Sequence, residues 1–259
     1  MTDSSEIDPS VQEFVAATCG WLYLPVRHKL TRYPIPELRL PRGDGRRFLD
    51  IGCNWGRWSI SATRMGYQVS AIDPNPAAIL AARRVAMQLG LEIDYRSGSS
   101  QVIPYAEATF DVVFSYSVLQ HLAKERVTAT IAEIDRVLKP GGLMMVQMPN
   151  WLGVRCLYHQ AKRGFRSERN FEVRYWGLGE LREAFGVIGE AKLSVDGFFG
   201  LGVQASDIDL MPRRMRGVIH ASETLRRVAR FATALIYVAD SVYVVVQKPT
   251  RELSTVAER

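Results

Sequence analysis

Hydrophobic and polar residues alternate between two spacings from residue 47 onward. The segments 47–51, 68–72, 91–95, 111–115 and 143–148 are short apolar runs, which are typical of buried strands. Helical spacing follows at 57–65 and at 77–89, where Pro76 precedes the helix and Gly90 ends it. This alternation predicts a parallel sheet with right-handed crossovers and helices on both faces. A ligand is then expected beyond the carboxyl ends of the strands.

Segments outside this alternation also have the spacing of helices or strands. Residues 10–31 predict an amphipathic helix that breaks at Pro25, and three further prolines then predict an extended connector. We expect this helix to cap the sheet, with Trp21 and Tyr23 as candidates for a substrate lid. Residues 178–185 predict another helix, and 192–198 and 241–247 predict two more strands.

Residues 212–236 predict one long amphipathic helix inserted before the last strand. Its apolar stripe consists of Met215, Val218, Ile219, Leu225, Val228, Ala232 and Leu235. We expect it to pack over an acceptor cleft as a lid. The alternative is peripheral contact of 212–236 with an anionic membrane or a lipid-linked acceptor, because arginines flank the stripe.

Charge and cysteine content limit the partners and the cellular compartment that we expect. The net charge is +6, and residues 151–235 hold 14 Lys and Arg against 9 Asp and Glu. This excess favours an anionic partner, although a solvated basic face is the simpler explanation. No apolar run is long enough to span a bilayer, and the polar start is unlike a signal peptide. Cys19, Cys53 and Cys156 lack metal-ligand spacing, so we expect free thiols and a cytoplasmic protein, with the inner membrane surface as an alternative.

The candidate chemistry begins between Phe48 and Trp58. A predicted strand ends in Asp50-Ile51, and Gly52 and Gly56 then bracket a turn that leads into a helix. Glycine adopts positive φ and permits close backbone approach, and a helix N-terminus offers unpaired N–H groups to a ligand. An ordinary strand-to-helix connection is the alternative interpretation.

A second acid favours a nucleoside ligand. Asp73 closes the second predicted strand 23 positions after Asp50, close to the spacing at which an acid holds ribose hydroxyls in dinucleotide-binding folds. A carboxylate can accept hydrogen bonds from two vicinal hydroxyls at once. The dinucleotide pattern would require a third glycine near position 57, but Arg57 stands there.

The motifs together resemble the class I S-adenosylmethionine-dependent methyltransferases, from about Phe48 to Asn150. They occur in that family's order: Asp50-Ile-Gly-Cys-Asn-Trp-Gly56, Ala71-Ile-Asp73, Gly98-Ser-Ser-Gln-Val-Ile-Pro104, Phe110 to His121, and Leu138-Lys-Pro-Gly-Gly-Leu143. The resemblance implies an α/β, Rossmann-like, doubly wound sheet of seven strands, mostly parallel, with the last strand antiparallel at the sheet edge. It also implies S-adenosylmethionine as the cofactor.

We therefore expect one methyltransferase domain over residues 1–259. Its parts would be an N-terminal helical cap (1–45), a cofactor-binding core (46–150), an acceptor-side segment with the helical lid (151–236), the last strand (237–249) and a tail (250–259).

The resemblance assigns roles to particular residues. The loop would pass the methionine and ribose portions, Asp73 would hold the ribose, and Ser99 and Ser100 would lie beside the adenine. The full set of expected cofactor residues is Asp50, Gly52, Cys53, Asn54, Gly56, Asp73, Pro74, Ser99, Ser100, Ser115 and Tyr116. The family often has glycine where Asn54 stands and Asp where Ser99 stands, so the cofactor affinity is less predictable.

His121 and His159 are the candidate general bases, because both follow strands on the side where the acceptor would lie. Tyr158, Arg166 and Tyr175 are candidate substrate contacts, and no residue pattern indicates a metal. The sequence thus predicts O-methylation of a small-molecule, sugar or lipid-linked hydroxyl. The alternatives are methylation of an RNA base or an amine, and a non-catalytic protein that binds S-adenosylmethionine as a membrane-associated scaffold.

Overall fold

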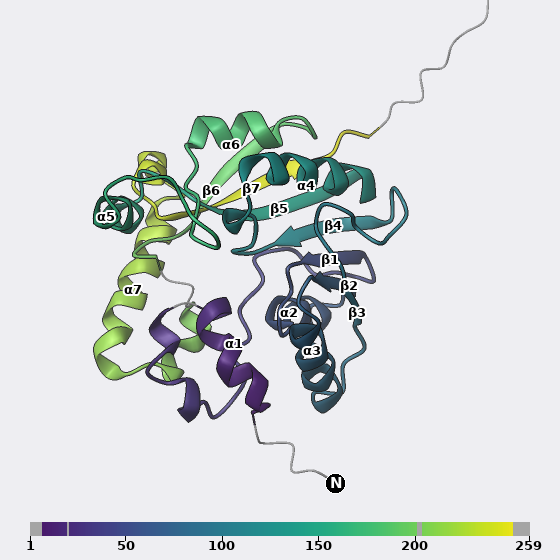
Figure 1. The fold of residues 1–259 in the computed structure, drawn as a ribbon, viewed down its shortest axis with the longest axis horizontal. Helices are drawn as coiled ribbons and strands as arrows, with labels where there is room; N and C mark the ends of the chain where they lie inside the picture. Colours follow the sequence, from purple (N-terminus) through teal and green to yellow (C-terminus); the bar gives the residue numbers. More distant parts are fainter. Residues whose placement is uncertain (1–6, 20, 201–203, 251–259) are drawn as a thin grey trace, which may run out of the picture.

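A seven-stranded sheet forms the centre of the molecule (Figure 1). The computed structural model describes residues 7–19, 21–200 and 204–250. The strands are β1 (Arg47–Ile51), β2 (Gln68–Asp73), β3 (Asp94–Ser97), β4 (Phe110–Ser115), β5 (Leu138–Pro149), β6 (Ala191–Gly197) and β7 (Ser241–Gln247). Their order is β3-β2-β1-β4-β5-β7-β6, and β7 runs antiparallel to both of its neighbours. The predicted edge position of the last strand is wrong, because β6 pairs with its outer side and forms the edge. The predicted fold class is confirmed.

The described residues form seven α-helices, which lie around the sheet. They are α1 (Pro9–Cys19), α2 (Arg57–Arg64), α3 (Pro76–Gln88), α4 (Lys124–Val137), α5 (Val154–Lys162), α6 (Leu178–Phe185) and α7 (Arg213–Val228). Short 3-10 helices include η3 (Leu119–His121), η4 (Ala205–Leu210) and η5 (Thr233–Tyr237). Among the described residues, no helix has both the length and the apolar character needed to cross a bilayer.

Both faces of the sheet are covered, which explains why its central strands are apolar throughout. On one face, Ile131 of α4 and Leu181 of α6 pack against apolar side chains of β1, β4 and β5. On the other face, Trp58 of α2 contacts Phe114 of β4 with ring centroids 5.1 Å apart. Such two-sided burial removes the polar alternation expected of a half-exposed strand.

The non-core helices gather at one end of the sheet. Figure 1 shows α1, α5 and α7 at the end toward which the parallel strands point. Ligands of such sheets bind at that end. The added segments therefore stand where they can complete a site.

Several predicted boundaries differ from the structure. The third strand is Asp94–Ser97, because Leu91 and Ile93 instead pack against the apolar face of α3. The fifth strand begins earlier, at Leu138, which pairs with Phe110 before a register shift. The prediction of one helix over 212–236 is wrong at its C-terminal part: α7 ends at Val228, and η5 follows.

The N-terminal helix is also shorter than predicted. It ends at Cys19, and only short 3-10 turns follow up to Lys29. The side chains of Cys19 and Trp21, and the tail from residue 251, lie outside the described residues.

Gly56 has a stability role that can be measured. Its φ is 89°, and a Cβ added there would lie 2.2 Å from the hydroxyl oxygen of the buried Tyr95. We expect Gly56→Ala to reduce the free energy of unfolding in urea by about 2–5 kcal/mol, through overpacking and left-handed strain together.

Gly90→Ala is the matched control. Gly90 also has a positive φ, 66°, but nothing lies within 4 Å of the added Cβ. It should lose only about 1–2 kcal/mol. Adding Tyr95→Phe to Gly56→Ala should recover part of the larger loss, and equal losses for the two glycines would contradict the steric explanation.

Candidate functional site

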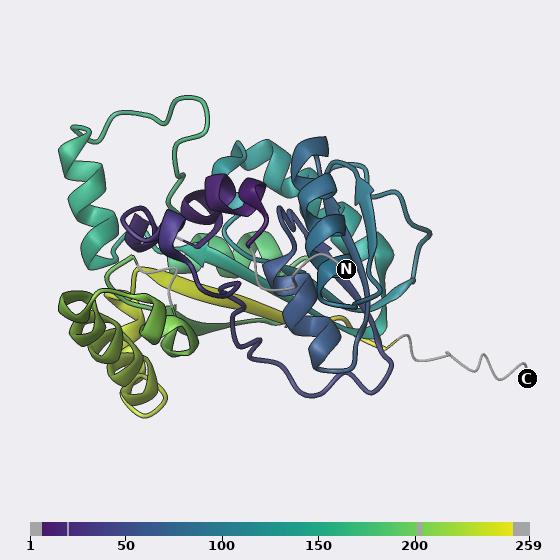
Figure 2. The ribbon, with the colours of Figure 1, turned by 90° about the horizontal axis from the view of Figure 1, so that it is seen from below.

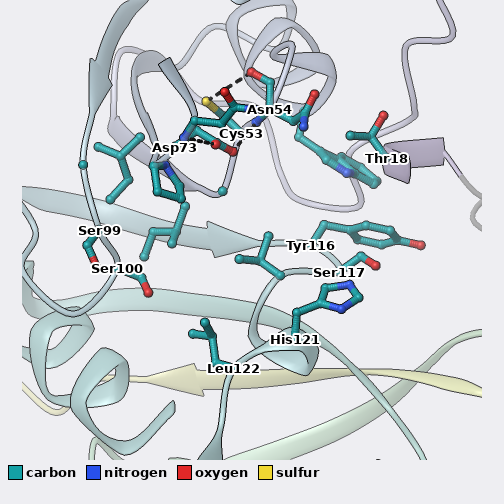
Figure 3. Close-up of a pocket in the computed structure, with 18 of the residues that line it drawn as sticks. Thr18, Cys53, Asn54, Asp73, Ser99, Ser100, Tyr116, Ser117, His121 and Leu122 are labelled. Carbon is teal, nitrogen blue, oxygen red and sulfur yellow. Dashed lines mark hydrogen bonds between the residues drawn. The ribbon is translucent and has the colours of Figure 1, made fainter. Parts of the chain in front are cut away.

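A cavity of about 370 Å³ opens at the carboxyl ends of β1, β2 and β4 (Figure 3). Its walls come from the loop after each of these strands, from the turn after β3, and from α1 and residue 171. A volume of this size is in the range of small-molecule sites. Six segments of the chain therefore meet around one ligand-sized space.

The loop after β1 brings backbone directly to the cavity. Gly52 has φ 74°, and a Cβ there would lie 2.3 Å from Val118 on the facing loop. Asn54 also adopts positive φ, 47°, which is uncommon for a residue with a side chain. Both residues line the cavity together with Cys53. The turn is therefore shaped so that main chain, not side chains, faces the ligand space.

Asp73 is held at the end of β2 by two backbone donors. Its Oδ2 accepts from Asn54 N at 2.9 Å, and its Oδ1 accepts from Asn75 N at 2.8 Å. Burial raises the pKa of this carboxyl although both hydrogen bonds oppose the shift. Each oxygen retains a lone pair. The geometry suits a carboxylate that accepts from a pair of vicinal hydroxyls.

The two ends of the cavity differ in character. Figure 3 shows Ser99 and Ser100 at one end and Thr18 and Tyr116 toward the other, with Asp73 on the wall between. Ser100 is fixed by a 2.9 Å hydrogen bond to Thr130 of α4. Apolar side chains such as Leu122 form the wall opposite Asp73. The polar and apolar groups at the serine end suit a heterocyclic base.

Asp50, Gly56 and Ser115, which were predicted to contact the cofactor, do not line this cavity, and their contact with a cofactor stays a prediction. Asp50 is 1% exposed and accepts from Ser59 Oγ at 2.6 Å, and burial raises its pKa to about 7. Ser115 Oγ donates to Ile51 O at 3.0 Å and so joins β4 to β1. Gly56 precedes α2 and packs under Tyr95. All three support the loop from below.

The other predicted cofactor residues line the cavity: Gly52, Cys53, Asn54, Asp73, Pro74, Ser99, Ser100 and Tyr116. Their contacts with a cofactor stay a prediction.

The N-terminal helix closes one side of the cavity, which the sequence did not predict. Thr18 lines the cavity, its Oγ1 accepts from Trp55 Nε1 at 2.9 Å, and its carbonyl accepts from Arg57 Nη1 at 3.2 Å. Arg57 is 2% exposed and lies 3.6 Å from the fully buried Asp207 of η4. No sequence signal joins positions 18, 57 and 207, because only folding brings them together.

Tyr23 belongs to this buried cluster instead of a substrate lid. Its hydroxyl donates to Asp207 Oδ2 at 2.5 Å, and its ring is fully buried. Helix α7 contributes no residue to the cavity; it packs on β6 and η4. Residues 212–236 line neither this cavity nor the smaller one beside it, so a lid role over the acceptor stays a prediction for them. Thr18 and Phe171 line the cofactor cavity instead.

A second cavity of about 210 Å³ adjoins the first and shares Tyr116 and Ser117 with it. Ser117 has φ 60°, a strained value for a side-chain-bearing residue and a common feature of functional sites. His159, Tyr175 and Gln147 line the second cavity. Two cavities that share a wall at the Tyr116 end can hold two reactants side by side.

Gln147 presents an unpaired acceptor here. Its Nε2 donates to Ser241 Oγ at 2.6 Å, and that hydroxyl donates to Asp196 Oδ2 at 2.8 Å. Because Nε2 is the atom that faces Ser241, the amide orientation is fixed. The amide oxygen Oε1 is buried and has no hydrogen-bond partner among the described residues. Because buried acceptors are rarely left unpaired, Oε1 is a candidate contact for a ligand that carries a donor.

His121 lines the first cavity but is held on both ring nitrogens. Nδ1 faces Phe171 O at 2.8 Å, and since a carbonyl only accepts, Nδ1 carries the proton. Nε2 then accepts from Gln120 Nε2 at 3.2 Å. Burial lowers the pKa of His121, so its ring is neutral near neutral pH. The ring also stacks on Phe171 with centroids 4.2 Å apart, which suits a wall better than a free base.

His159 has a freer ring on the second cavity. Its ring makes no hydrogen bond to the described residues, and the ring centroid lies 5.5 Å from that of Tyr158. Partial burial lowers its pKa, and Arg155 and Lys162 lower it further. An available neutral imidazole beside the shared wall is what proton removal from an acceptor requires.

The predicted substrate contacts are brought together only in part. Tyr175 lines the second cavity, and burial raises its pKa to about 12. Tyr158 is 59% exposed, Arg166 forms an ion pair with Glu172 at 2.7 Å, and neither lines a cavity beside β4. Substrate contact by these two residues stays a prediction. Among the described residues, no group of three or more His, Cys, Asp or Glu is arranged to hold a metal ion.

Comparison with known proteins agrees with this site. Residues 48–142 match the family model described as a methyltransferase domain. A ubiquinone biosynthesis O-methyltransferase of Maricaulis maris is 41% identical over 103 residues, which are 39% of this chain and 40% of that protein. The chain thus matches about two fifths of the length of the curated relatives.

Solved structures share the fold at low identity. A SAM-dependent methyltransferase from Methanosarcina mazei aligns with a TM-score of 0.55 at 17% identity, covering 80% of this chain and 94% of that one. The [4+2]-cyclase SpnF aligns with a TM-score of 0.52 at 18% identity, covering 93% of this chain and 81% of that one. Residues 48–142 thus match a methyltransferase domain, as the motifs predicted, and the solved structures share its fold. Because a cyclase shares the fold, the reaction has to be argued from the site.

The burial of Asp50 predicts an unusual pH dependence of stability. A carboxyl whose pKa is raised on folding contributes stability below its unfolded pKa, and this contribution is lost as the pH rises through the folded pKa. For Asp50 the window runs from about pH 4 to about pH 7. We expect Asp50→Asn to reduce the fall in unfolding free energy across this window by about 1–4 kcal/mol. Urea titrations at several pH values measure it, and an unchanged slope would show that Asp50 does not titrate there.

Proposed function

We propose that the protein, whose residues 48–142 form a class I methyltransferase core, transfers a methyl group from S-adenosylmethionine to a hydroxyl of a small-molecule acceptor. The observation that carries this proposal is the pair of adjoining cavities, which share Tyr116 and Ser117. The first cavity suits an adenosine-containing donor, and the second offers a neutral base and an unpaired acceptor atom.

The residues of the first cavity fit the donor. Asp73 would accept from the ribose hydroxyls, the main chain at Gly52–Asn54 would pass the ribose and methionine portions, and Ser99 and Ser100 would lie at the adenine. The bound donor would supply an activated methyl group. The chain's contribution is alignment of the reactants in a space that Thr18 and Phe171 help to close, since positioning accounts for much of such catalysis.

A hydroxyl acceptor explains the second cavity better than an amine does. A hydroxyl has to lose a proton, and His159 can take it, whereas a free amine needs little base assistance. Gln147 Oε1 would accept from a hydroxyl of the acceptor and orient it. The named O-methyltransferase relatives support the same reaction type. In this proposal His159 is the base, and His121 is a wall of the cofactor cavity.

Contact of 212–236 with an anionic membrane is a competing proposal, which vesicle binding by a Phe231 variant tests. Helix α7 buries Ile219 and Ser222 against the body, while Val218, Val228 and Phe231 are exposed by 39%, 45% and 92%. These exposed side chains lie among arginines, a composition that suits an anionic surface.

Cofactor binding tests the role of Asp73. We expect Asp73→Asn to weaken binding of S-adenosylhomocysteine by about a hundredfold in calorimetry, because two charge-assisted hydrogen bonds to ribose are lost. Asp50→Asn is the matched control, since Asp50 lies under the same loop without lining the cavity. It should keep nearly full affinity. Absence of binding heat with the unmodified, folded chain would refute the assignment of the cavity.

The base is tested by its pH profile. With a panel of phenolic, sugar and lipid-linked hydroxyl acceptors, we expect His159→Asn to lower kcat by about 10²–10⁴-fold while cofactor affinity is retained. The lowered pKa of His159 places the acidic limb of the kcat/KM profile below the usual histidine value, and the variant should lack this limb. Methylation of amines or RNA alone, with no acidic limb, would favour the N-methyltransferase alternative, and cofactor binding without any transfer would favour a scaffold.

A further inference from the structure

The outward side of α5 is apolar and exposed. Val154, Leu157 and Tyr158 are exposed by 59%, 38% and 59%, and Ala161 is exposed one turn beyond. The positions 154, 157, 158 and 161 follow the i, i+3, i+4, i+7 spacing that places side chains on one face of a helix. Exposed apolar side chains at such spacing form a patch, whereas scattered ones would need no explanation.

Neighbouring segments extend this patch. Trp151, Leu152 and Phe165, at the two ends of the helix, are exposed by 47%, 40% and 66%. Tyr237 and Val238, exposed by 57% and 43%, lie beside the start of α5, where Val154 N donates to Val238 O at 3.3 Å. We call these side chains, with Val154, Leu157, Tyr158 and Ala161, the α5 face. Figure 2 shows α5 projecting at one end of the molecule, where a large partner can approach it.

The charges around the α5 face are positive. Residues 151–176 contain six Lys and Arg and two Glu. Both glutamates are already in ion pairs, Glu168 with Arg163 and Glu172 with Arg166. Lys162 and Arg169 have no carboxylate partner among the described residues. An apolar patch with Trp and Tyr beside unpaired cations is the composition of protein surfaces that bind anionic lipid.

We propose that the α5 face docks the protein on an anionic lipid bilayer. The apolar side chains would enter the boundary between headgroups and acyl chains, and Lys162 and Arg169 would contact phosphate groups. The mixed aromatic and cationic character favours a bilayer over a protein surface, because interfacial Trp and Tyr side chains place an apolar ring beside a polar group.

The same helix connects this surface to the second cavity. Cys156 and Gln160 of α5 are buried against the body, and Arg155, Cys156 and His159 line the second cavity. When the α5 face rests on the bilayer, the wall of the second cavity, formed by the same helix, lies close to the membrane surface. Resting on the proposed function, this arrangement indicates an acceptor with a lipid portion, which enters the second cavity from the bilayer.

Vesicle flotation of the full chain tests the docking. We expect binding to phosphatidylcholine vesicles that contain about one third phosphatidylglycerol, little binding to phosphatidylcholine alone, and weaker binding as salt increases. Leu157→Ser combined with Tyr158→Ser should lower the bound fraction at least about tenfold, since both side chains lose apolar burial in the bilayer. Lys162→Glu with Arg169→Glu should remove the preference for the anionic lipid.

Phe231→Ser is the control from the competing 212–236 segment, because Phe231 is 92% exposed but lies outside the α5 face. It should bind vesicles like the unmodified chain. Loss of binding in Phe231→Ser alone, no binding to anionic vesicles, or a dimer in sedimentation that only the Leu157/Tyr158 variant dissociates would each overturn the proposal. S-adenosylhomocysteine calorimetry on every variant reports folding and cofactor binding separately, so failure of the docking is distinguishable from failure of the proposed function.

Discussion

The hydrogen bond from Asn54 N to Asp73 Oδ2 joins the ends of two adjacent strands across the ligand space. It holds the loop after β1 and the turn after β2 at a fixed separation, and Asn75 N fixes the other carboxylate oxygen. The close approach of Gly52 to Val118 sets the opposite wall. Because packed interiors transmit small displacements, a change at this point would alter the shape of the first cavity.

Two other buried acids, Asp240 and Asp196, also hold distant segments together. Asp240 Oδ1 accepts from Arg155 N and Cys156 N in the first turn of α5, and its Oδ2 accepts from Gly200 N. An acid from outside the helix thereby satisfies N–H groups that α5 itself leaves unpaired. Asp196 accepts from Tyr116, Ser241 and Arg39, and so fixes the floor beneath Gln147. Hydrogen bonds between segments far apart in the chain therefore position the residues around the second cavity.

As a result, the three sides of α5 have different surroundings. The side with Cys156 and Gln160 is packed, the side with Arg155 and His159 faces the second cavity, and the α5 face is open to the surroundings. A helix that only needed to complete the fold would not require exposed Leu157 and Tyr158. Recognition of the acceptor and recognition of its surroundings can thus be combined in one short element.

The sequence by itself determined the sheet, its parallel core, the glycine turn and Asp73, because these depend on local periodicity and on residues close together in the chain. The hydrogen bonds of Asp50 and Ser115 beneath the loop were not predicted, since a strand-end position does not reveal which way a side chain points. Thr18, Ser117, Gln147 and Phe171 were missed for a different reason: their part in the site arises from contacts between distant segments. The end of α7 at Val228 and the open side of α5 likewise depend on which surfaces find a partner, and only the tertiary structure decides that.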